Sequence, residues 1–156
     1  YVTGDLGHLD ARGRLTISGR MKRFVKVGGE MISLGAMEEV LNTYILQKLS
    51  ELSPDEGHSK GPVLAIHAVE TEGQRPRLHL LTCLTMTLAE ANHALNAGGM
   101  SNIARLASIV KIEHIPLTGT GKVAYKDLST AFETACQRGQ LEESSTLEDS
   151  ECSEDI

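Results

Sequence analysis

The stretch that decides the fold is "GRMKRFVKVGGEMISL", residues 19–34. Its apolar run predicts a strand over 23–27, and a similar run predicts a strand over 15–18 just before it. Glycines separate these runs and flank the second one, so we expect the two to form a hairpin-like unit. Ser33 is a suitable cap for a helix that continues to about Lys48, because apolar residues recur there at helical spacing.

The rest of the chain alternates between strand and helix signals. After a polar loop over 50–62, the predicted elements are an antiparallel pair of strands (63–70 and 77–85), a helix that starts with a Thr87/Glu90 capping box and ends near Asn96, a short helix (102–106), a third strand (108–115) and a last helix (126–137). We therefore predict an α+β domain, with a small central sheet of about three strands flanked by helices, and an N-terminal β-hairpin.

Composition and charge favour one domain with a tail at its end. The chain has 156 residues, 40% of them hydrophobic, which suffices for one core. The formal net charge of -6 is concentrated at the end, because residues 142–156 are rich in Asp and Glu and contain no Lys or Arg. We predict that residues 139–156 form an acidic disordered tail, since such a composition cannot bury enough apolar surface to offset the entropy of ordering. A tail that binds a partner is the alternative.

Several functions are disfavoured by residue usage. The three cysteines have no paired spacing and the six histidines form no ligand pattern, which favours a reducing compartment and no structural metal. Two Phe, three Tyr and no Trp leave few rings for stacking on bases, so we expect no nucleic-acid partner. No apolar run approaches the roughly 18–20 residues that span a bilayer. The chain starts at Tyr1 without a Met, inside a motif, and we expect it to be a piece of a longer protein.

A glycine-rich loop is the first candidate site. In "IPLTGTGKVAY", residues 115–125, backbone N–H groups and Lys122 could hold phosphate oxygens. The loop is not a Walker A motif, because Pro116 and Val123 stand where that motif requires Gly and Ser or Thr. By itself, this pattern is more often an ordinary surface turn.

Two further candidates lie near the N-terminus. In "YVTGDLG" the carboxylate of Asp5 could accept hydrogen bonds from ribose hydroxyls, and an Asx turn is the structural alternative. Six basic residues fall within fifteen positions, which describes either a solvated face or a surface for phosphates or an acidic partner: Arg12, Arg14, Arg20, Lys22, Arg23 and Lys26.

The order and spacing of "YVTGDLG", "GRMKRFVKVGGEMI" and "IPLTGTGK" resemble the C-terminal part of the adenylate-forming enzymes. This superfamily includes acyl-CoA synthetases, adenylation domains of peptide synthetases and luciferases. The resemblance covers residues 1 to about 135. It implies that residues 1–21 are the end of a large-domain region and the approach to a hinge, and that 22–138 form the C-terminal lid domain.

The resemblance also implies roles for individual residues. Asp5 and Arg20 match positions that bind the nucleotide, and Lys22 matches the hinge about which the lid swivels. Lys122 matches the catalytic lysine that reaches the carboxylate and the α-phosphate during adenylation. A cation there is physically sensible, because it offsets the repulsion between two anions that must approach each other.

After adenylation, enzymes of this superfamily rotate the lid and present another face to a pantetheine thiol. Gly28 and Gly29 match that face, and their lack of side chains would leave a narrow thioester tunnel open. Arg23 and Lys26 lie beside the hinge in sequence, and we expect them to dock an acyl carrier protein, whose surface is typically acidic. The same charges would suit the 3'-phosphate of coenzyme A.

Departures from the peptide-synthetase pattern narrow the resemblance. Gly28, Met31 and Ser33 replace the Arg, Arg and Glu that are typical there. "GRMKRFVKVGGEMISL" and "IEHIPLTGTGKVAY" look closest to the synthetase part of the bifunctional acyl-[acyl carrier protein] synthetase/2-acylglycerophosphoethanolamine acyltransferases. The implied activity is ATP-dependent ligation of a fatty acid to the phosphopantetheine of acyl carrier protein, feeding lysophospholipid reacylation.

This resemblance leaves two alternatives, a fatty acyl-CoA ligase domain and a non-catalytic partner-binding module. ATP and Mg²⁺ would be bound mainly by an N-terminal adenylation domain in cis, so we expect these residues alone to be inactive. We expect a cytoplasmic location, with the parent protein at the inner face of the cytoplasmic membrane.

Overall fold

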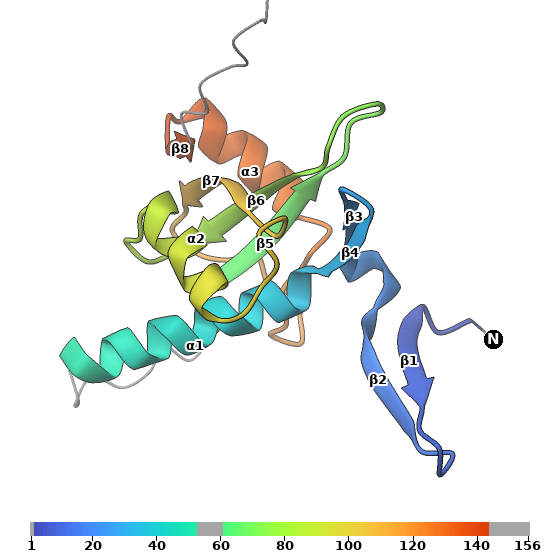
Figure 1. Cartoon of the computed structure of the whole chain (residues 1–156). Helices are drawn as coiled ribbons and strands as arrows, with labels where there is room; N and C mark the ends of the chain where they lie inside the picture. The colour runs from blue at the N-terminus through green and yellow to red at the C-terminus, as the bar shows by residue number, and fades with distance from the viewer. Residues whose placement is uncertain (1, 53–60, 144–156) are drawn as a thin grey trace, which may run out of the picture.

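A computed structural model of the chain describes residues 2–52 and 61–143. Its elements are β1 (Asp5–Leu9), β2 (Leu15–Arg20), the 3-10 helix η1 (Met21–Arg23), β3 (Phe24–Val27), β4 (Glu30–Ser33), α1 (Leu34–Leu52), β5 (Leu64–Val69), β6 (Arg77–Thr82), α2 (Leu88–Ala97), β7 (Leu106–Lys111), α3 (Leu128–Gln137) and β8 (Leu141–Glu143). Figure 1 shows a body of sheet and helices from which the hairpin β1–β2 extends. The predicted α+β class is confirmed.

The central sheet has the strand order β5-β6-β7-β8. β5 is antiparallel to β6, as predicted, while β7 is parallel to β6 and β8 antiparallel to β7. Helix α2 makes the crossover that a parallel pair requires. The described sheet thus has four strands, one more than the sequence predicted.

The two faces of this sheet carry separate hydrophobic clusters. Ile66 and Leu80 face the larger cluster, which includes Met37 of α1 and Leu95 of α2. On the opposite face, Ala65 and Leu81 form a smaller cluster with Ile115 and Leu128, at the start of α3. Neighbouring strand residues point to opposite faces, so the near-continuous apolar sequence of β5 and β6 reflects burial on both sides.

The predicted pairing of 15–18 with 23–27 is wrong. β2 pairs with β1, and β3 pairs with β4. The reason is the turn between Val27 and Glu30, where Gly28 has φ +57° and Gly29 has φ +93°. Two central residues with positive φ form a tight hairpin turn, so β3 folds back onto β4 rather than onto β2.

The start of β7 also differs from the prediction, because a side chain forms hydrogen bonds with the backbone there. The predicted short helix over 102–106 is wrong, because Asn92 binds both backbone groups of Leu106 and fixes it at the start of β7. Its Oδ1 accepts from Leu106 N at 2.8 Å, and its Nδ2 donates to Leu106 O at 3.2 Å. The predicted helix caps are confirmed: Ser33 Oγ accepts from Ala36 N, and Thr87 Oγ1 from Glu90 N.

The expected tail starts at residue 139, but residues 141–143 form β8, and Glu142 accepts a hydrogen bond from Leu88 N. The remainder of that tail, residues 144–156, lies outside the described residues. Within the part of the chain that the structure describes, no helix is both long and apolar enough to cross a membrane.

A buried histidine lies in the middle of the sheet. His79 is 4% exposed, and its Nδ1 lies 2.7 Å from Ser108 Oγ. Its ring centroid is 4.4 Å from that of Phe132, and His67 is its partner on β5. Burial, with smaller contributions from Arg77 and His67, lowers the pKa of His79 to about 4.

We expect acid to destabilise the domain through this residue. The folded-state pKa lies below the ordinary value of 6.5, so the stability is complete above pH 6.5 and falls as the pH drops toward 4. The free energy of unfolding should decrease by about 2–3 kcal/mol over this window. Denaturant titrations of the chain between pH 7 and pH 4 measure it, and His79→Gln should flatten the profile. The matched change His67→Gln should keep most of the pH dependence. An unchanged profile in His79→Gln would contradict the assignment of this pH dependence to His79.

Candidate functional site

The Lys122 loop is closed by its own hydrogen bonds. Leu117 and Val123 form a β-bridge across its base, and Thr118 N donates to Lys122 O at 2.7 Å. At its tip Gly121, with φ +79°, donates to Thr118 O, and Thr118 Oγ1 accepts from Lys122 N. The Lys122 side chain is exposed, and no carboxylate of the described residues forms an ion pair with it. A defined loop thus presents the ammonium group of Lys122 to solvent.

Asp5 and Arg20, both predicted to bind a nucleotide, are brought together. They are opposite each other in the β1–β2 pair, and Arg20 Nε lies 3.0 Å from Asp5 Oδ1. The expected alternative, an Asx turn at Asp5, occurs instead at Asp10, whose Oδ1 accepts from the backbone N of Arg12 and Arg14. Asp5 Oδ2 receives no hydrogen bond from the described residues, so it can accept from hydroxyl groups of a ligand.

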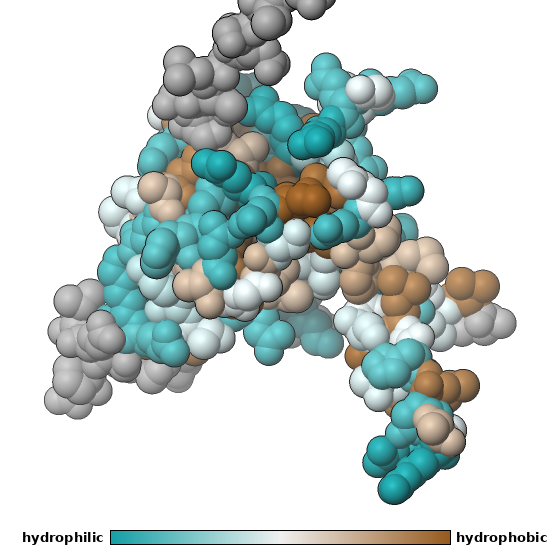
Figure 2. All heavy atoms as spheres, viewed as in Figure 1, coloured by the Kyte–Doolittle hydropathy of each residue, from teal (hydrophilic) through white to brown (hydrophobic). Residues whose placement is uncertain are grey.

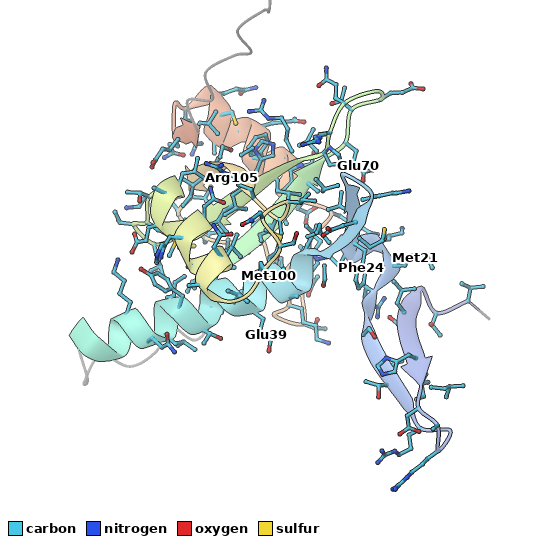
Figure 3. The ribbon with its side chains drawn as sticks, in the orientation of Figure 1. Met21, Phe24, Glu39, Glu70, Met100 and Arg105 are labelled. Carbon is cyan, nitrogen blue, oxygen red and sulfur yellow. The ribbon has the colours of Figure 1, made fainter. Side chains whose placement is uncertain are left out.

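The predicted hinge, Lys22, lies at the narrow connection between hairpin and body. It is an exposed residue of η1, and the preceding residue Met21 donates its backbone N–H to Gly4 O at 2.8 Å. Figure 3 shows Met21 and Phe24 at this connection. The chain on the N-terminal side of Lys22 is therefore tied to β1, and the chain on its C-terminal side enters β3.

Arg23, the next residue, is turned into the body. Its Nη1 donates to Ile66 O at 3.0 Å, and its Nη2 lies 2.5 Å from Glu38 Oε1. The guanidinium carbon lies 3.9 Å from the ring centroid of Tyr125. The exposed fraction of the Arg23 side chain is 15%. Because its donors are occupied within the domain, this geometry does not support the expectation that Arg23 docks a carrier protein.

Glu38 completes this network from α1. Its Oε1 also accepts from Ile66 N at 2.7 Å, and its Oε2 accepts from the Tyr125 hydroxyl at 3.1 Å. Burial and the neighbouring Glu38 carboxylate raise the pKa of Tyr125, so the phenol remains a donor. The network joins η1, α1 and β5 to Tyr125, three residues beyond Lys122.

The predicted thiol-facing residues lie at the other end of β3. Gly28 and Gly29 form the β3–β4 turn, so their positive φ angles are one sufficient reason for glycine. A Cβ on Gly29 would meet no atom within 4 Å, whereas one on Gly28 would lie 3.6 Å from Ile103. Lys26 is exposed beside this turn, opposite the exposed Met31. The open space in front of Gly29 is compatible with a narrow ligand passing there.

The cluster of six basic residues is half neutralised. Arg14 pairs with Asp10, Arg20 with Asp5 and Arg23 with Glu38. Among the described residues, Arg12, Lys22 and Lys26 form no ion pair. The basic surface for a phosphate or an acidic partner is therefore smaller than the sequence suggested.

The sequence has recognisable relatives, although no family model matches it. The Anguibactin system regulator of Vibrio anguillarum is 32% identical over 130 residues, 83% of this chain and 12% of that protein. The 3-methylmercaptopropionyl-CoA ligase of Ruegeria pomeroyi is 30% identical over 137 residues, 85% of this chain and 22% of that protein. The nonribosomal peptide synthetase atnA of Emericella nidulans is 47% identical over 49 residues, 31% of this chain and 1% of that protein. The chain thus spans less than a quarter of the length of these relatives.

Solved structures give the fold. ATP-bound MatB of Rhodopseudomonas palustris superimposes with a TM-score of 0.60 at 21% identity, over 85% of this chain and 24% of that one. O-succinylbenzoate coenzyme A synthetase of Bacillus subtilis, in complex with AMP, superimposes with a TM-score of 0.56 at 22% identity. The match covers 81% of this chain and 23% of that one. The chain has the fold of an adenylate-forming C-terminal domain. The curated relatives agree with this fold, since they include a CoA ligase and a nonribosomal peptide synthetase.

In this C-terminal domain, sequence reasoning missed the contribution of Glu38 and Tyr125. The sequence indicates for Glu38 only a favourable charge near the start of a helix, and for Tyr125 only the end of the lysine motif. A carboxylate at a core-facing helical position, between Met37 and Leu41, was the available signal, because buried charges require partners. The identity of those partners depends on the tertiary fold.

Proposed function

We propose that this chain is the C-terminal lid of an ATP-dependent ligase, which activates a fatty acid as its acyl-adenylate and transfers the acyl group to the pantetheine thiol of an acyl carrier protein. One observation carries the proposal: in a domain with the adenylate-forming fold, a self-closed loop presents the ammonium group of Lys122 without an ion-pair partner among the described residues.

Lys122 would act in the first half-reaction. A carboxylate oxygen of the fatty acid attacks the α-phosphorus of ATP, and the bond from that phosphorus to the pyrophosphate oxygen breaks. The reactants are both anionic, so a cation between them lowers the barrier. Asp5 would accept hydrogen bonds from ribose hydroxyls through its free Oδ2, with Arg20 holding the carboxylate in place.

The second half-reaction would use the opposite end of β3. The thiolate sulfur attacks the acyl carbonyl carbon, the bond to AMP breaks, and a thioester and AMP are released. Lys22 is the proposed pivot between the two arrangements, since it is exposed in the segment that connects β2 to β3. Gly28 and Gly29 would then line the passage for the pantetheine arm.

The acceptor is proposed from the charges beside that passage. Lys26 is exposed and without an ion pair among the described residues, so it can meet an acidic carrier protein. Coenzyme A is the second candidate, because one relative is named as a CoA ligase and one similar structure as a coenzyme A synthetase. Its 3'-phosphate could use the same lysine.

Exposed apolar side chains on the projecting hairpin suit an N-terminal adenylation domain in cis. Leu9, Leu15 and Ile17 of the hairpin are each more than half exposed, and so is Met21 of the adjoining η1. Figure 2 shows hydrophobic residues on this hairpin. We propose that these side chains pack against that other domain.

ATP and its Mg²⁺ would be bound mainly by that other domain. The described residues contain no group of three or more His, Cys, Asp or Glu side chains that could hold a metal ion. What they supply is an acceptor for ribose at Asp5 and a cation for phosphate at Lys122. We extend the proposal to lysophospholipid reacylation by the product thioester, at the cytoplasmic face of a membrane.

The acceptor assay tests this proposal. The full-length protein is incubated with labelled fatty acid, ATP and Mg²⁺, and holo-acyl carrier protein or coenzyme A is offered in parallel. We expect thioester on the carrier protein, and less of it at high salt, because the docking contact is electrostatic. Lys26→Ala should reduce the transfer, while Arg12→Ala, a similar loss of charge on the hairpin, should not. Thioester on coenzyme A alone would reassign the acceptor.

A further inference from the structure

We propose that Arg23, Glu38 and Tyr125 are positioning residues that fix the Lys122 loop to the hinge segment, so that the ammonium group reaches the adenylation site. This inference rests on the proposed function. None of the three needs to touch a substrate, because each acts through the placement of Lys122.

The network connects both segments that must move together. Arg23 directly follows the proposed pivot Lys22, and its guanidinium is held by Ile66 O, by Glu38 and by the face of Tyr125. The chain after the pivot is thereby fixed to β5 and α1. A rotation about Lys22 is then transmitted to the body of the domain at its first residue.

Tyr125 extends this attachment to the catalytic loop. Ala124, the residue before it, donates its backbone N–H to Pro116 O at 2.8 Å, and Val123 forms a bridge with Leu117. Both strands of the loop base are therefore coupled to Tyr125, whose hydroxyl is held by Glu38 Oε2 at 3.1 Å. The loop tip closes on itself through hydrogen bonds, so it moves as a unit with its base. A displacement of the base therefore displaces Lys122.

The position of Lys122 matters more for one half-reaction than for the other. A cation that must lie between a carboxylate and a phosphate loses effect quickly when it is displaced by an ångström. In the proposed mechanism, the thiol attacks the finished adenylate only after the lysine has withdrawn. Loosening the network should therefore slow adenylate formation selectively.

Tyr125→Phe is the appropriate test, because the tyrosine is 42% exposed and the ring that covers Arg23 is retained. In the full-length protein we expect adenylate formation from fatty acid and ATP to fall about tenfold at saturating substrate. Thioester formation from supplied acyl-adenylate should stay within about twofold. Tyr125→Leu, which also removes the ring, should slow adenylation further.

Tyr44→Phe is the matched control. Tyr44 likewise donates its hydroxyl to a carboxylate, Glu90 Oε1 at 2.9 Å, but it does so between α1 and α2. This variant should form adenylate at the wild-type rate. In a Lys122→Ala background, Tyr125→Phe should have no additional effect, because the group that it positions is gone.

The outcomes are distinct. Wild-type adenylation in Tyr125→Phe, or an equal loss in both half-reactions, would overturn the positioning role. So would an additive effect with Lys122→Ala. Hydrogen exchange of the Ala124 amide, which donates to Pro116 O at the base of the loop, gives a second readout, and we expect it to be faster in Tyr125→Phe. Unchanged exchange would overturn the coupling, whereas a wild-type protein inactive with every fatty acid would refute the proposed function itself.

Discussion

Lys122→Ala in the full-length protein should lower the rate of acyl-adenylate formation by about 10²–10³-fold, the cost of removing one preorganised charge-stabilising group. The transfer of the acyl group from supplied acyl-adenylate to the thiol should be nearly unchanged. The reason is geometric: the ammonium group has no ion-pair partner among the described residues, so its removal leaves the fold intact. Pyrophosphate release and thioester formation, measured separately, report the two effects.

Lys126→Ala is the control for that experiment. Lys126 is also exposed and lies four residues further along, just before α3. Its loss changes the net charge identically but should leave adenylation within about twofold. Equal losses in Lys122→Ala and Lys126→Ala would show that general charge, rather than the position of Lys122, is responsible.

Glu38→Ala should destabilise the domain by about 3–5 kcal/mol, because it leaves a buried charge without its partner. The Glu38 side chain is 11% exposed, and its carboxylate receives hydrogen bonds from Arg23, Ile66 N and Tyr125. Its removal leaves the Arg23 guanidinium without its carboxylate partner and the buried Ile66 N–H without its acceptor. Denaturant unfolding of the chain near neutral pH measures the loss.

The adjacent residue provides the matched comparison. Glu39 is in the same turn of α1, has the same charge near the helix start and is exposed, as Figure 3 shows. Glu39→Ala should change the free energy of unfolding by no more than about 0.5 kcal/mol. If both variants lose the same stability, the helix dipole rather than the Arg23 network explains the effect.

Local rules predicted most elements of the fold. The caps at Ser33 and Thr87 and the antiparallel pair β5–β6 could be predicted from side-chain chemistry and apolar patterns within a few residues. One error was local, because the Gly28–Gly29 turn that pairs β3 with β4 is visible in the sequence. Two other errors were tertiary. β8 is three residues long and is stabilised by pairing with β7, and Asn92 recruits Leu106 into the sheet across fourteen positions. No local pattern contains those partners.

The site shows the same division. The motifs singled out Lys122, Asp5 and Arg20, and the structure places Asp5 beside Arg20 and leaves Lys122 without an ion pair among the described residues. The sequence could not show that Arg23 faces inward, because a basic run on a hairpin has no periodicity that separates a buried arginine from exposed lysines. Its burial depends on Glu38 and Tyr125, which are 15 and 102 positions away.

The most direct test of the central claim is the exchange of labelled pyrophosphate into ATP that depends on an added fatty acid. It is measured with the full-length protein and short, medium and long straight-chain fatty acids. We predict exchange with at least one of these acids, and its loss in Lys122→Ala. Exchange that persists in Lys122→Ala would contradict the assignment of this domain as the lid of a fatty-acid-activating ligase. So would the absence of exchange in the wild-type protein with every fatty acid.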